Sequence, residues 1–365
     1  MRKASINTLL LCLLFGAQSA QVLLAQEAAS GIDFRATLTA QAVASHELAE
    51  EPRSGSPVIL GSHSVIYPTW KISSNWFVAG ALELSTRPYY AEDYSTKGYG
   101  ANGAVIQSSL NYSRVSDKGS VLLRVGILPT AFGSFMLRYD DMDNALVGLP
   151  IGYGYYYSLL STRGVAGGQA DAAKGRWDGR VQFANSSPTN PRSLFARDQY
   201  GNWAGGAGYT IRQGLHVGVS ALRGPYLSRD YQYFLPGEAN PNTLPAHAVG
   251  LDVNWAHGHT SLQGEMQRFV MPYSAIPTFR ESVGYGEFKR TISPRWYLAA
   301  RGGYSTAKAS GDKETLEAAA GFRTNRFQLI KAGYEYEHYS TGSDRNDSAF
   351  AVQLVTTLHR AVGRD

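Results

Sequence analysis

Apolar and polar residues alternate along most of this chain beyond residue 30. In the stretch 76–85, Val78, Leu82 and Leu84 share one parity, and small or polar residues such as Glu83 occupy most of the other. A period of two is typical of a β-strand with one apolar face, and no stretch beyond residue 30 keeps the period of a helix. The pattern therefore predicts an all-β fold. The same alternation recurs in the stretches 121–128, 248–255 and 350–359.

Short and long connections alternate along the chain between these stretches. Seven are short and rich in Gly, Asn, Asp, Ser and Pro, and eight are longer. Fifteen connections join sixteen strands, which is an even number. The short turns lie at 73–75, 116–119, 174–175, 212–214, 257–259, 293–294 and 324–325. The longer connections lie at 44–63, 87–101, 129–162, 187–202, 224–245, 270–280, 306–312 and 340–345.

An even number of antiparallel strands, with short turns at one end and long loops at the other, is typical of a transmembrane β-barrel of the bacterial outer membrane. In hydrocarbon every backbone N–H and C=O group needs a partner, so a sheet that spans the membrane must close on itself. Strands of about 9–11 residues are long enough to cross. We therefore predict one antiparallel barrel of about sixteen strands over residues 31–360, followed by a short polar tail, 361–365.

The tryptophans give an independent indication of a membrane. Five of the six lie within a few residues of a short turn, where they would form an aromatic belt at one membrane interface. Tryptophan also favours strand ends in soluble β-proteins, so this second interpretation stays open. The five are Trp70, Trp76, Trp177, Trp255 and Trp296.

The first 25 residues have the layout of a secretory signal peptide. Arg2 and Lys3 precede an apolar run that is too short to span a membrane as a helix, and small residues follow it. Cleavage after Ala20 and cleavage after Ala25 both fit this pattern. The chain's one cysteine, Cys12, lies inside the apolar run. We therefore predict export to the outer membrane and a mature chain without thiol chemistry.

The composition excludes several other classes. Charged residues make up 17% of the chain, against about 25% in a typical globular protein, and the mean hydropathy is −0.23. The polarity therefore comes largely from residues such as Gly and Ser. An aromatic content of 12% argues against disorder, and one cysteine excludes a disulfide scaffold. The net charge of +5 is too small to indicate nucleic acid as a partner.

The longest connection, 129–162, is the main candidate for function, because long loops in compact folds are usually functional. Its beginning, Arg124-Val-Gly-Ile-Leu-Pro-Thr-Ala-Phe-Gly133, resembles the entry into the third long loop of the phosphate-selective porin-like families. The resemblance to bacterial porins, which have sixteen strands, implies that this loop folds inward and forms a constriction. It also implies a homotrimer.

Charged residues around this loop suit a constriction. Acids on the loop that face bases on the wall would create a transverse field in a narrow water-filled throat. The acidic group could instead be a solvated turn or a calcium site. The constriction candidates are Arg138, Asp140, Asp141 and Asp143. The candidates that line the pore from the strands are Arg35, Arg124, Arg180, Arg301 and Glu265.

The function expected from these features is passive diffusion of small hydrophilic solutes or ions through a porin in the lipids of the outer membrane. The chain shows no Gly-x-Ser-x-Gly, His-Glu-x-x-His or phosphate-binding Gly-rich motif, so we expect no catalysis, cofactor or metal. Two alternatives remain: an outer-membrane barrel enzyme, and a soluble secreted β-protein that binds carbohydrate.

Overall fold

The computed structural model describes residues 31–45, 58–87, 100–135, 139–153, 164–185, 201–225, 244–307, 311–341 and 346–363. The expected signal peptide and the candidate Arg138 lie outside these residues. The described residues form strands and turns, and no helix among them is long and apolar enough to cross a membrane.

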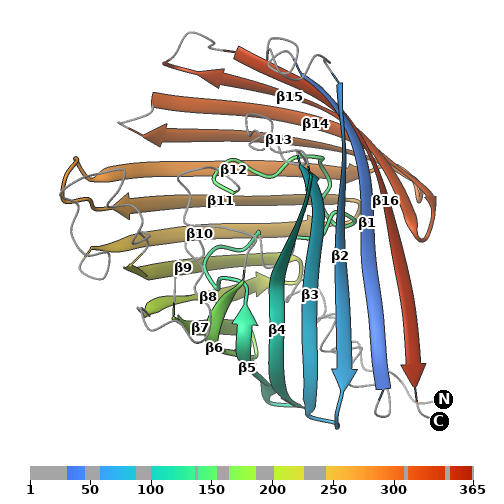
Figure 1. The fold of residues 1–365 in the computed structure, drawn as a ribbon, viewed down its shortest axis with the longest axis vertical. Coiled ribbons are helices and arrows are strands. Elements are labelled where there is room, and N and C mark those ends of the chain that lie inside the picture. The colour runs from blue at the N-terminus through green and yellow to red at the C-terminus, as the bar shows by residue number, and fades with distance from the viewer. Residues whose placement is uncertain are drawn as a thin grey trace.

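Sixteen antiparallel strands form one closed barrel, in which each strand pairs with its sequence neighbours and β1 pairs with β16 (Figure 1). This confirms the predicted fold class and strand number. The strands are β1 (Gly31–Ser45), β2 (Val58–Lys71), β3 (Trp76–Arg87), β4 (Gly100–Ser116), β5 (Gly119–Leu128), β6 (Val165–Lys174), β7 (Trp177–Ala184), β8 (Asn202–Arg212), β9 (Leu215–Pro225), β10 (Pro245–His257), β11 (Thr260–Met271), β12 (Phe279–Thr291), β13 (Trp296–Ala307), β14 (Gly311–Asn325), β15 (Gln328–Tyr339) and β16 (Asn346–Gly363).

All seven predicted short turns join consecutive strands at one end of the barrel, which we call the short-turn end; the opposite end is the long-loop end. Several boundaries differ from the prediction, because pairing continues where apolar alternation fades. β1 and β2 extend into the predicted connection 44–63, and the gap between β13 and β14 is only 308–310. Gly31 pairs with Gly363, so most of the expected polar tail belongs to β16.

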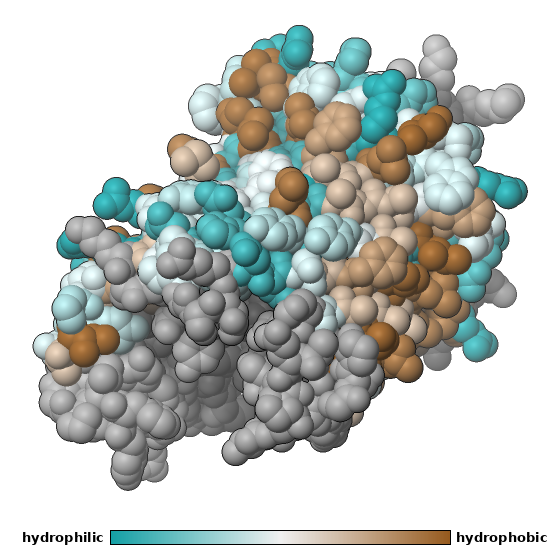
Figure 2. Space-filling view, turned by 90° about the horizontal axis from the view of Figure 1, so that it is seen from above, coloured by the Kyte–Doolittle hydropathy of each residue, from teal (hydrophilic) through white to brown (hydrophobic). Residues whose placement is uncertain are grey.

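The two faces of the strands meet different surroundings. Outward side chains such as Leu60, Val125 and Met266 are 77%, 67% and 70% exposed, whereas the inward Thr37 and Gln353 are buried. Figure 2 shows one outer side of the barrel, on which apolar side chains gather over a wide area. A closed sheet with an outer band of exposed apolar side chains is typical of barrels that lie in a lipid bilayer.

The tryptophans of the described strands lie near the two ends of the barrel. Four of the five predicted belt residues are 44–64% exposed on the outer face next to short turns: Trp70, Trp76, Trp177 and Trp296. Trp255, which is half-buried, stacks on His257 at the same end. The sixth, Trp203, contacts Phe183 near the long-loop end, with 4.7 Å between ring centroids. Aromatic side chains therefore occupy both ends of the outer surface of the barrel.

Candidate functional site

The third long connection, which joins β5 to β6, is the candidate functional site. We call it the third loop. Its described residues, 129–135 and 139–153, contact inward side chains of β1, β2, β7, β9, β11, β12, β13, β14 and β15. Figure 1 shows the green segment inside the barrel. Phe132 and Leu146 have no exposed surface. The loop therefore packs inside the barrel, and four sets of contacts hold it there.

The first set is on β7, next to the start of the loop. Gln182 Nε2 donates to the carbonyl of Pro129 at 2.7 Å, and Gln182 Oε1 accepts from the N–H of Ala131 at 3.1 Å. Arg180 Nε donates to the carbonyl of Ala131 at 2.7 Å, and a second guanidinium nitrogen donates to that of Gly133. The predicted pore-lining residue Arg180 thus binds the loop backbone.

Glu265, on β11, forms the second set. Its carboxylate accepts from the N–H groups of Ser134 and Phe135 and from the hydroxyl of Tyr153. Gln267 also donates to the hydroxyl of Tyr153, at 2.8 Å. Glu265 is 4% exposed, so its predicted place on the surface of the pore is wrong. Glu265 does lie on the inward face of β11, as the alternation predicts, but the loop covers this part of the wall.

The third set joins Asp140 to β1 and β2. Its Oδ2 accepts from Arg35 at 3.0 Å and from the hydroxyl of Tyr67 at 2.7 Å, and Thr37 donates to both carboxylate oxygens. The residue is 2% exposed. Arg35, which we predicted to face the loop across water, therefore contacts it directly.

Asp141 completes this third set. It is 1% exposed and accepts from Thr39 at 2.7 Å, from Tyr139 at 2.5 Å and from His63 Nδ1 at 2.7 Å. The other ring nitrogen of His63 lies 2.8 Å from Glu83. Burial alone would raise the pKa of Asp141, but the hydrogen bond and charge of His63, together with Lys331, hold it well below its usual range. The solvated-turn alternative is therefore wrong for Asp140 and Asp141.

The fourth set lies on β12 to β15, where a buried network binds residues 141–148. Arg301 donates to Glu287, Glu317, Asn144 Oδ1 and the carbonyl of Gly148. Glu317 in turn accepts from the N–H groups of Val147 and Gly148, both at 3.0 Å. The predicted pore-lining residue Arg301 is 3% exposed, because the loop covers it. Its guanidinium therefore binds the loop and does not line the pore.

Lys331, on β15, is the most buried cation of the described wall, with no exposed surface. Its ammonium donates to the carbonyls of Asp141 at 2.9 Å, Asn144 at 3.3 Å and Leu146 at 3.0 Å. An ammonium has three N–H donors, and here each has a loop carbonyl as its acceptor. One strand residue thus fixes three points of the loop backbone.

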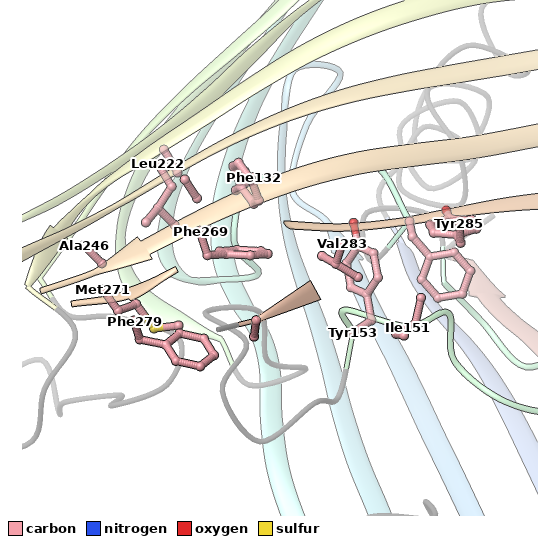
Figure 3. Close-up of a cluster of buried hydrophobic side chains, with 14 of the residues drawn as sticks. Phe132, Ile151, Tyr153, Leu222, Ala246, Phe269, Met271, Phe279, Val283 and Tyr285 are labelled. Carbon is pink, nitrogen blue, oxygen red and sulfur yellow. The ribbon is translucent and has the colours of Figure 1, made fainter. Parts of the chain in front are cut away.

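Apolar packing supports the loop along β8 to β13. Phe132, Phe135, Ile151 and Tyr153 pack against inward residues of the wall (Figure 3). The rings of Phe132 and Phe269 meet edge to face, with 5.9 Å between centroids. The wall residues that take part include Leu222, Ala246, Ala248, Phe269, Met271, Phe279, Val283 and Tyr285. The loop that covers this apolar patch explains its place on the inner face of the barrel.

Asp143 is the loop carboxylate that remains exposed. Arg35, Lys289 and Arg323 lie within electrostatic range of it, from β1, β12 and β14. Lys289 and Arg323 are inward and half-exposed; Lys289 lies over the ring of Tyr297, and Arg323 contacts Met142. The remaining candidate, Arg124, forms an ion pair with Asp171 at 2.7 Å and is 5% exposed.

The structure thus changes the candidate set. Among the described residues, no group of three or more His, Cys, Asp or Glu side chains could hold a metal ion. Sequence reasoning missed several residues that matter: His63, Lys289, Glu317, Arg323 and Lys331. Their signal was available, because each is a charged or titratable residue at an inward position of a strand.

We expect Asp143→Asn to shift ion selectivity toward anions by about twofold, since one unit charge at about 8 Å in water contributes ~0.5 kcal/mol. The reversal potential across a salt gradient measures this shift. Asp117→Asn is the control, because Asp117 lies exposed in the turn between β4 and β5. A reversal potential unchanged by Asp143→Asn would place the carboxylate outside the ion path.

Comparison with protein-family models gives no match, and no curated protein matches by sequence. Comparison with solved structures gives similar folds. OmpF of Salmonella typhi, in complex with daunomycin, has a TM-score of 0.62 at 12% identity, with 90% of this chain and 98% of that chain covered. The chain therefore has the fold of outer-membrane β-barrel proteins.

Two further structures agree. The anion-selective porin from Comamonas acidovorans has a TM-score of 0.59 at 10% identity, with 90% of this chain and 100% of that chain covered. OmpT, an outer-membrane protein of Vibrio cholerae in a trimer form, has a TM-score of 0.58 at 12% identity, with the same coverage of 90% and 100%. At such low identity the likeness concerns the fold.

Proposed function

We propose that this protein is an outer-membrane porin, which lets small hydrophilic solutes or ions diffuse through the barrel without catalysis. The observation that carries the proposal is the third loop, which side chains of the wall hold inside a closed barrel. A barrel of sixteen strands is wide enough for an aqueous channel, and a fixed loop would narrow it. The fold shared with porins supports this assignment.

The charges beside the loop favour anions. Arg35 is neutralised by its ion pair with Asp140, so Lys289 and Arg323 oppose the single exposed carboxylate of Asp143. This leaves a local excess of positive charge in the proposed path, which would attract anions at low ionic strength. The finer resemblance to phosphate-selective porin-like families stays a prediction within this proposal.

Planar-bilayer recording of the full-length protein tests the proposal. We expect stable ohmic steps, with a reversal potential that shows a modest preference for chloride over potassium. The control is the same protein after heat denaturation, added at the same detergent concentration. A folded barrel that inserts into the bilayer but stays silent would overturn the proposal and favour the alternative, an outer-membrane barrel enzyme.

The proposal includes a homotrimer, export by a signal peptide, and no cofactor. The trimer form of OmpT and the porin resemblance support the first of these. Cross-linking in native membranes, followed by electrophoresis without boiling, measures the number of subunits. A single species at the mass of one chain would contradict the trimer without affecting the proposed channel.

A further inference from the structure

Four exposed basic side chains lie on the outer face of the barrel at the long-loop end. They are on four adjacent strands: Arg223 on β9, His247 on β10, Arg268 on β11 and Arg280 on β12. The strand register places them side by side. Arg223 pairs with His247, His247 pairs with Val270, and Val270 pairs with Arg280. Arg268 is two residues from Val270 on the same face.

Within the described part of the chain, these basic side chains have no ion-pair or hydrogen-bond partner. The outward positions of β9 to β12 carry no Asp or Glu. Among the described strand residues, the nearest outward carboxylates are Asp312 and Glu314 on β14, and Asp312 accepts a hydrogen bond from Tyr304 at 2.9 Å. The basic group therefore has no protein counter-charge on its own strands.

The height of this group matches a membrane interface. Trp203, on β8, pairs directly with Arg223 and is 56% exposed. Tryptophan on the outer face of a barrel lies at the level of the lipid headgroups. Toward the short-turn end from the basic group, the same strands expose apolar side chains to lipid: Val249 57%, Leu251 60% and Met266 70%.

A shallow dent on the outer face adjoins these apolar side chains. Gly264, Gly286 and Gly302 lie side by side on β11, β12 and β13. An added Cβ at Gly286 or at Gly302 would have no neighbour within 4 Å, so the space outside them is open. Four residues separate Gly264 from Arg268, or about 13 Å along the strand. Met266, which lies between them, offers a flexible apolar contact.

We propose that Arg223, His247, Arg268 and Arg280 bind the phosphate-bearing headgroup of an anionic lipid in the leaflet at the long-loop end, with an acyl chain in the glycine dent. The basic group spans four strands, or about 14 Å, which suits a headgroup with more than one anionic oxygen cluster. Arginine binds phosphate through paired N–H donors. The inference rests on the proposed membrane location and is independent of solute passage.

Native mass spectrometry of the full-length protein in neutral detergent tests this site with phosphatidic acid as the probe. The test variant carries Arg223→Gln, Arg268→Gln and Arg280→Gln. The matched control carries Arg114→Gln, Lys174→Gln and Arg360→Gln, which removes three exposed charges at the short-turn end. We expect the test variant to bind phosphatidic acid on the order of a hundredfold more weakly, and the control to keep the wild-type affinity.

Three outcomes would overturn the site: unchanged affinity in the test variant, an equal loss in the control, and equal wild-type affinities for phosphatidic acid and phosphatidylcholine. Displacement of the lipid by millimolar inorganic phosphate would show a free-anion site instead.

A second variant, Gly286→Leu with Gly302→Leu, tests the dent, because both positions have room for a side chain. We expect this variant to bind the lipid more weakly although its arginines are intact. The bilayer conductance of every variant is measured as well, so that a loss of lipid binding can be distinguished from a loss of the proposed channel function.

Discussion

Lys331→Met is expected to release the third loop and to increase the current noise of the proposed channel. Methionine replaces the aliphatic part of the lysine side chain with an unbranched apolar side chain of similar size. It removes the ammonium that binds the carbonyls of Asp141, Asn144 and Leu146. These three acceptors would stay inside the barrel without their donor. A buried acceptor left without a donor costs about 1–3 kcal/mol, so three of them together cost at least about 3 kcal/mol. We therefore expect the detached state of the loop to become at least about 100-fold more populated.

Two measurements check this expectation: the variance of single-channel current, and the rate of proteolysis within residues 139–153. Lys313→Met is the matched control, because Lys313 is another inward lysine and forms an ion pair with Glu337 at 2.7 Å. It should leave both quantities near the wild-type values. If Lys331→Met keeps the wild-type noise and protease resistance, the other contacts suffice to hold the loop.

Most of the barrel could be predicted from the sequence, because a period of two and alternating connection lengths are local signals. Every predicted short turn joins two strands. Strand ends were harder to predict because pairing continues beyond the segment in which apolar residues alternate. β16, for example, extends to Gly363, where its partner on β1 is Gly31.

The candidate site could be predicted only in part from the sequence. Parity correctly placed Arg35, Arg124, Arg180 and Arg301 on the inner wall. It could not show that the loop covers Arg301, because that depends on contacts between residues 144–148 and strands more than 150 positions away. The distinction between a side chain that lines water and one that holds a loop requires the tertiary structure.

Lys289→Glu with Arg323→Glu is expected to change the proposed channel from the expected modest preference for anions to a clear preference for cations. The pair changes the local charge by about four units, and each unit contributes ~0.5 kcal/mol at about 8 Å in water. We expect the permeability ratio of potassium to chloride to rise by at least about tenfold at low salt. Because mobile ions screen these charges, the change should shrink as ionic strength increases.

The control for this pair is Arg290→Glu with Arg360→Glu, which makes the same change of charge on exposed outer side chains at the same end of the barrel. Arg290 follows Lys289 directly on β12, so the two variants differ mainly in the face of the sheet that carries the charge. Reversal potentials in salt gradients should move for the inner pair and stay near wild type for the outer pair. Equal shifts in both variants would mean that selectivity arises from the surface potential of the whole barrel, and the region beside Asp143 would then have no special role in the ion path.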